Sequence, residues 1–166
     1  MEQRAPTILI VEDDADTREV VGRTVSSAGY GVRLAANGWE GLLALEDRVD
    51  LILLDMMLPG MDGYSFLRSL RGQKAGRDIP VVIVTGMDTA EVAKRVHGQG
   101  VRYILPKGGD FYRNLKDTMK RVLGAPPGTG AGVAGAAHPR DVQGRAEAVS
   151  MIRPYLDLYL RTVAWG

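Results

Sequence analysis

The stretch that decides the fold is LILLDMMLPGMDG, residues 51–63. Residues 51–54 are four aliphatic side chains in a row, and such an unbroken run predicts a strand buried on both faces, as in a parallel sheet. Asp55 follows the run directly, and Pro59 and Gly60 then mark a turn. The sequence therefore predicts a carboxylate at the tip of a buried strand.

Three further apolar runs end in the same way, at a side chain that can do chemistry. They are residues 8–11, followed by Glu12 and Asp13; residues 81–84, followed by Thr85; and residues 104–106, followed by Lys107. Because the carboxyl ends of parallel strands meet at one edge of a sheet, we expect these groups to gather there with Asp55. Carboxylates can hold a divalent cation, and a hydroxyl and an ammonium can contact a phosphoryl group.

Strands and helices are expected to alternate along the chain. The predicted strands are residues 7–11, 31–35, 50–54, 80–84 and 102–105, and the predicted helices are residues 16–28, 37–48, 62–71, 88–98 and 110–123. This alternation predicts an α/β fold with a five-stranded parallel sheet, doubly wound and flavodoxin-like, with five helices on its two faces. In such folds ligands bind beyond the carboxyl ends of the strands, which is where the polar groups are expected.

Short polar side chains mark several helix starts. Asn37 and Glu40, and again Asp88 and Glu91, have the spacing of a capping box. Asp14 precedes the first helix and is interpreted as its cap rather than as a ligand.

The overall composition is that of an ordinary globular protein. The 166 residues are 45% hydrophobic and 25% charged, and a net charge of +1 argues against nucleic acid or an anionic membrane as partner. There is no cysteine, which excludes disulfides and zinc–thiolate sites. Acidic residues interrupt any secretion-signal pattern near residue 12, and no apolar run approaches the roughly 20 residues of a membrane span. The sequence predicts a cytoplasmic protein.

The chain changes character after residue 124. Residues 125–138 are rich in Gly, Ala and Pro and predict a linker, and residues 139–166 predict a helical extension beyond a domain at residues 6–124. Eight of the eleven residues 155–165 are apolar or aromatic, too many to leave in water. We expect this segment to form a homodimer by pairing with a second copy; the alternative is a seat on its own domain.

Four motifs of this chain together resemble those of the receiver domains of two-component response regulators. They are the acid pair Glu12-Asp13, the block at residues 55–63, Thr85-Gly86 and Lys107. The resemblance covers about residues 6–123. It implies that Asp55 accepts a phosphoryl group from a histidine kinase or a histidine phosphotransfer protein, with Thr85 and Lys107 contacting phosphate oxygens. The resulting switch would act on a downstream protein target.

Mg²⁺ is also part of what the resemblance implies. Asp13, Asp55 and the backbone carbonyl of Met57 would ligate the ion, and Glu12 would act through a water. The protein's only catalysis would then be its own phosphorylation and dephosphorylation at Asp55.

The chain departs from the family's pattern in three places. Gly108 follows Lys107 where receivers generally have proline, so a trans peptide bond is expected there. Ile104 takes the place of the usual aromatic switch residue, and Tyr103, one residue earlier, is expected on the other face of the strand. The residues after 138 are too few for a DNA-binding output domain.

Two other functions stay open on the sequence. The first is a receiver-shaped docking module that is not phosphorylated, which Gly108 and Ile104 favour. The second is a phosphatase with an Asp nucleophile. That chemistry usually needs a second acid two residues after the nucleophile, and Met57 occupies that position here.

Overall fold

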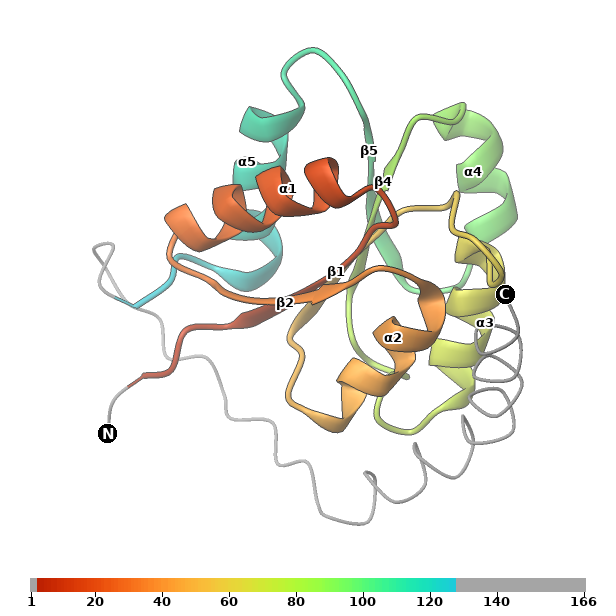
Figure 1. Ribbon diagram of the computed structural model, residues 1–166, viewed down its shortest axis with the longest axis horizontal. Helices are drawn as coiled ribbons and strands as arrows, with labels where there is room; N and C mark the ends of the chain where they lie inside the picture. Colours follow the sequence, from red (N-terminus) through yellow and green to blue (C-terminus); the bar gives the residue numbers. More distant parts are fainter. Residues whose placement is uncertain (1–2, 128–166) are drawn as a thin grey trace.

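The computed structural model describes residues 3–127, so the expectations for residues 139–166 and for most of the linker lie outside the described part of the chain. Strand and helix alternate throughout that part (Figure 1). The strands are β1 (Thr7–Val11), β2 (Gly31–Ala35), β3 (Leu51–Leu54), β4 (Val81–Thr85) and β5 (Val101–Pro106); the helices are α1 (Ala15–Ser27), α2 (Gly38–Leu43), α3 (Gly63–Gly72), α4 (Thr89–Val96) and α5 (Phe111–Leu123).

The strands form one parallel sheet in the order β2-β1-β3-β4-β5. α1 and α5 cover one face, and α2, α3 and α4 cover the other, which gives three layers (Figure 1). β1, β3 and β4 are buried along their whole length, whereas β2 is a partly exposed edge strand. The predicted doubly wound α/β fold is therefore confirmed. No helix of the described range is long and apolar enough to cross a membrane.

The register of the central strands places the functional edge. Along β1, Leu9 and Val11 pack with the α2–α4 layer, and Ile8 and Ile10 pack with the α1–α5 layer. Burial of each such side chain contributes roughly 1.5–3 kcal/mol, so a slip by one residue would be costly. Val11 is paired with Leu54, and therefore the residues that follow them, at the switch of strand order, lie side by side.

The second helix is shorter than predicted. The prediction of one helix over residues 37–48 is wrong in its second half, because α2 ends at Leu43 and a 3₁₀ turn follows over Ala44–Glu46. Asp47 then leaves helical backbone, with φ −96° and ψ 164°, and its carboxylate pairs with Arg33 of β2 at 2.9 Å. This tie to the edge strand is a tertiary contact that the helical pattern of the sequence does not contain.

Side-chain caps fix the starts of α1, α2, α3 and α4, whereas Asp110 before α5 makes no such bond. The carboxylates of Asp14, Asp62 and Asp88 and the amide oxygen of Asn37 each accept a hydrogen bond from the backbone N–H three residues on. At the predicted box of Asn37, the Glu40 N–H donates to Asn37 Oδ1 at 2.9 Å, and the Glu40 carboxylate accepts from the N–H of Ala36 at 2.7 Å. The cap of α3 matters most for function, since it ends the loop that begins at the tip of β3.

Candidate functional site

The strand ends bring the predicted polar residues to one edge of the sheet. Glu12 and Asp13 follow β1, Asp55 follows β3, Thr85 is the last residue of β4, and Lys107 follows β5. Backbone hydrogen bonds extend the sheet pairing into these residues: Glu12 N–H donates to the Ala35 carbonyl at 3.0 Å, and Asp55 N–H donates to the Val11 carbonyl at 3.0 Å. The edge is therefore a continuation of the sheet and not a set of free loops.

Three carboxylates converge there. One oxygen from each of Glu12, Asp13 and Asp55 lies within 4.8 Å of the other two. Glu12 and Asp55 are buried, at 4% and 6% exposure, and Asp13 is exposed. A sparse set of hard oxygen donors with one open side suits a cation that keeps several of its waters.

Lys107 neutralises part of this charge. Its Nζ donates to Glu12 Oε2 at 2.7 Å and to Asp55 Oδ2 at 3.0 Å. Burial by itself would lower the pKa of Lys107, but the hydrogen bonds to the two carboxylates outweigh burial and leave the pKa raised. Burial also raises the pKa of Glu12, against the lowering effect of its bond to Lys107. The ammonium thus stays charged beside Asp55, where an anionic ligand would need it.

Thr85 lies beside Lys107 and is completely buried. The backbone N–H of Lys107 donates to the Thr85 carbonyl at 2.9 Å. The Thr85 hydroxyl oxygen accepts from the N–H of Met87 at 3.1 Å, so it holds the first turn of the loop that leads into α4. A change at this hydroxyl would be felt directly by that loop.

Two features of the site were not predicted from the sequence. The Arg18 guanidinium of α1 donates through Nη1 to the carbonyls of Glu12 at 2.8 Å and of Asp13 at 3.2 Å, which fixes the acidic pair. Asp55 also accepts the N–H of Met57 at 3.1 Å, an Asx turn that orients the carboxylate. The sequence did contain a signal for Arg18: it is a basic residue in the first turns of the helix that comes directly after Glu12 and Asp13.

The structure bears out the two departures near Lys107. No peptide bond within residues 3–127 is cis, that of Lys107–Gly108 included, and Gly108 has φ +125°, a backbone region that favours glycine. Ile104 packs with the α2–α4 layer, whereas Tyr103 is 38% exposed and pairs in register with Val82, which faces the other layer. The aromatic side chain is therefore on the opposite face from Ile104, as the one-residue offset predicts.

In the metal-free protein, Asp13→Asn is expected to raise Tm. Three carboxylates face one ammonium, so removal of one negative charge relieves repulsion. Asp55→Asn should gain less, because Asp55 also loses its ion pair with Lys107. Thermal melts at low ionic strength measure the rise, and molar salt should reduce it. Asp16→Asn, an exposed acid of α1 outside the cluster, is the control; an Asp13→Asn variant less stable than wild type would contradict the repulsion.

Comparison with known proteins gives relatives of one kind. A family model described as the response regulator receiver domain matches residues 8–118. Response regulator MprA of Mycobacterium tuberculosis is 42% identical over 117 residues, which are 70% of this chain and 46% of MprA. Transcriptional regulatory protein HprR of Escherichia coli is 40% identical over 105 residues, 63% of this chain and 46% of HprR. The chain thus spans about half the length of the curated relatives it matches.

Solved structures share the fold over almost their whole length. Chemotaxis protein CheY4 of Vibrio cholerae superposes with a TM-score of 0.67 at 31% identity, covering 72% of this chain and 99% of CheY4. The receiver domain of sensor histidine kinase PA1611 of Pseudomonas aeruginosa, solved with a magnesium ion in its active-site cleft, gives 0.65 at 31% identity, covering 72% and 98%. With strand order, strand-end groups and family match in agreement, this chain belongs to the response regulator receiver domain family.

Proposed function

We propose that this receiver acts in a two-component phosphorelay by accepting a phosphoryl group on Asp55. The observation that carries the proposal is the place of Asp55: it stands at the tip of β3, with the Lys107 ammonium 3.0 Å from its carboxylate and one oxygen each of Glu12 and Asp13 within 4.8 Å. A carboxylate so placed needs only positioning and charge neutralisation to attack phosphorus, because phosphoryl transfer asks little covalent help of the protein.

Mg²⁺ fits the three-carboxylate cluster. Asp13 and Asp55 would ligate the ion with the Met57 carbonyl, and Glu12 would contact it through a water. When bound, Mg²⁺ supplies charge neutralisation for the phosphoryl oxygens and for the carboxylates. The oxygen-only donor set supports this assignment, as does the magnesium ion in the cleft of the related PA1611 receiver.

The chain's own groups divide the remaining work. An Asp55 carboxylate oxygen forms the new P–O bond as the donor's bond to phosphorus breaks and its electron pair returns to the donor. Lys107, which already contacts Asp55, moves its charge to a phosphate oxygen. Thr85 turns its hydroxyl to a second oxygen and gives up the Met87 N–H, which shifts the loop before α4. In self-dephosphorylation water attacks the phosphorus, the P–O bond to Asp55 breaks with its electron pair returning to the carboxylate, and inorganic phosphate leaves.

The partners follow from this chemistry. The donor is a histidine kinase or a histidine phosphotransfer protein in the cytoplasm, and the output is a changed affinity for a downstream protein. We infer no direct binding to nucleic acid or to a membrane, because a net charge of +1 provides no electrostatic attraction to either.

The test is intact-mass spectrometry of the full chain after incubation with acetyl phosphate. We expect the mass of one added phosphoryl group with Mg²⁺ present, and no addition when EDTA removes the cation. A chain that gains no phosphoryl group with Mg²⁺ would contradict the proposal and leave an unphosphorylated docking module. Steady turnover of external phosphate esters would point instead to a phosphatase.

The acyl phosphate is expected to be long-lived, and Met57→Asn should shorten its life. The Met57 side chain is 66% exposed beside Asp55, and Met87, two residues after Thr85, packs partly into the core. Neither thioether can orient an attacking water as an amide could. One added hydrogen bond in the transition state is worth about tenfold in hydrolysis rate. Decay of the phosphorylated mass in Mg²⁺ buffer gives the rate.

Met57→Leu is the matched control for this lifetime. Leucine keeps an apolar side chain at the same position, so the wild-type lifetime should persist. Equal decay rates for wild type, Met57→Leu and Met57→Asn would show that this side chain does not limit hydrolysis.

A further inference from the structure

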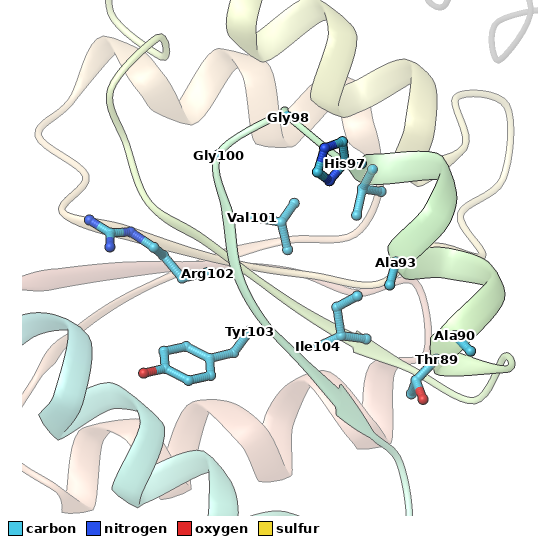
Figure 2. Close-up of a pocket in the computed structure, with 11 residues that line it drawn as sticks. Thr89, Ala90, Ala93, His97, Gly98, Gly100, Val101, Arg102, Tyr103 and Ile104 are labelled. Atoms are coloured by element: carbon cyan, nitrogen blue, oxygen red, sulfur yellow. The ribbon is translucent and has the colours of Figure 1, made fainter.

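An open groove lies between α4 and β5, on a different surface from the carboxylate cluster (Figure 2). Its volume is about 600 Å³. Figure 2 shows Ile104 of β5 pointing toward α4. The α4 side chains that line the groove there, Ala90 and Ala93, are small and leave space between the helix and the strand. The lining is otherwise made by residues at the two ends of the groove, among them Thr89, Val96, His97, Gly100 and Val101.

The groove offers apolar surface that residues 3–127 leave uncovered. Ala90 and Ala93 are exposed on α4, and Val101 and Ile104 are only half-buried on β5. Small side chains on one wall and branched ones on the other make a surface that can receive bulky apolar side chains from outside. Arg102 borders the groove through β5, and Figure 2 shows its side chain pointing away from α4.

We propose that residues 155–165 of the same chain bind in this groove. That segment holds eight apolar or aromatic residues out of eleven, including Tyr155, Tyr159 and Trp165, which need apolar contacts. Any protein that binds the α4–β5 surface must then displace residues 155–165, so this segment competes with partner proteins for the groove.

The chain between the receiver domain and residues 155–165 is long enough for this segment to reach the groove. The end of α5 is held near β2, because the Tyr30 hydroxyl, one residue before β2, donates to the Gly124 carbonyl at 2.9 Å. The groove lies at β5, four strand spacings or roughly 20 Å away across the sheet, and on the opposite face from α5, which adds roughly 10 Å. The linker residues 128–138 extend to roughly 36 Å at most, and the predicted helix over residues 139–154 adds about 24 Å at 1.5 Å per residue. The segment can therefore reach the groove of its own domain.

Tethering favours this seat over the homodimer predicted from the sequence. A linker whose average length matches the distance to be spanned gives an effective concentration of about 1 mM. A second copy at micromolar concentration cannot match that. The dimer is therefore the competing outcome in the test.

The test uses paramagnetic broadening in the full chain. The sequence has no cysteine, so Gly166→Cys gives one site for a nitroxide spin label. We expect the amide NMR signals of Ala93, His97 and Val101 to lose at least half their intensity, while those of Val20 and Leu34 on the α1–β2 side keep theirs. Strongest broadening on the α1–β2 side, or no broadening within the domain, would overturn the proposal.

Three further samples distinguish binding in this groove from the alternatives. A mixture of labelled unenriched chain with enriched unlabelled chain should show no broadening; broadening there would mean that the segment sits on a second copy. Ala93→Glu places a charge in the groove at an exposed helical position and should restore the intensities at least twofold. Val20→Glu, an exposed apolar residue of α1, is the matched control and should leave the broadening unchanged. Unchanged broadening in Ala93→Glu would contradict the groove as the seat.

Discussion

Asp55→Asn is expected to remove phosphoryl uptake from acetyl phosphate altogether. Asparagine keeps the shape of the side chain and can still accept the Met57 N–H. Its amide oxygen is neutral, however, so it is a far poorer nucleophile and a weaker ligand for a cation than a carboxylate oxygen. The variant should also lose the ion pair with Lys107 without losing the fold, because Glu12 still holds that ammonium. Intact mass in Mg²⁺ buffer measures the loss.

Asp62→Asn is the matched control for this loss. Asp62 belongs to the same loop but caps α3, where its carboxylate accepts the Ser65 N–H at 2.8 Å. Asparagine caps a helix about as well as aspartate, so the variant should fold and take up phosphoryl groups like wild type. Uptake that persists in Asp55→Asn, or disappears equally in Asp62→Asn, would contradict the assignment of Asp55.

Gly63→Ala is expected to lower the free energy of unfolding by about 3 kcal/mol. Gly63 begins α3, and a Cβ there would lie 2.7 Å from Met56 Cα and 3.0 Å from the Asp55 carbonyl oxygen. Both are backbone atoms, which cannot rotate away. The N–H of Gly63 also donates to the Met56 carbonyl at 3.0 Å, so the clash would push directly on the loop that positions Asp55. Guanidinium unfolding curves measure the change.

Gly72→Ala gives the opposite expectation in the same helix. Nothing lies within 4 Å of a Cβ at Gly72, the last residue of α3. Alanine should therefore stabilise the protein by about 0.5–1 kcal/mol, because it restricts the unfolded chain. Equal effects of the two substitutions would mean that the close approach of α3 to the Asp55 loop is not tight.

The fold was predictable because burial decides it. The unbroken apolar runs that became β1, β3 and β4 are buried at every residue, and no helix could hide such runs on one face. The place of the site followed from the fold, since strand ends of a parallel sheet share one edge. Once Val11 and Leu54 are paired, Glu12 and Asp55 must be neighbours.

The remaining features depend on contacts that a linear pattern does not contain. Arg18 fixes the acidic pair by bonds to backbone carbonyls, which any sequence supplies, so only the path of the chain reveals them. The early end of α2 is accompanied by an ion pair between Asp47 and Arg33 across the edge of the sheet, a contact between residues far apart in the sequence. Lys107 lies close enough to Glu12 and Asp55 to bond both carboxylates. This position likewise depends on the pairing of β5 with β4.

The central claim is that Asp55 itself carries the phosphoryl group. Borohydride reduces an aspartyl phosphate to homoserine, which marks the modified residue permanently. The full chain should be phosphorylated with acetyl phosphate and Mg²⁺, reduced, digested and sequenced by mass spectrometry. The account predicts homoserine at position 55 and unmodified acids at Glu12, Asp13 and Asp62. A reduced alcohol side chain at any of those other positions, or an intact Asp55 in protein that has taken up phosphate, would contradict it.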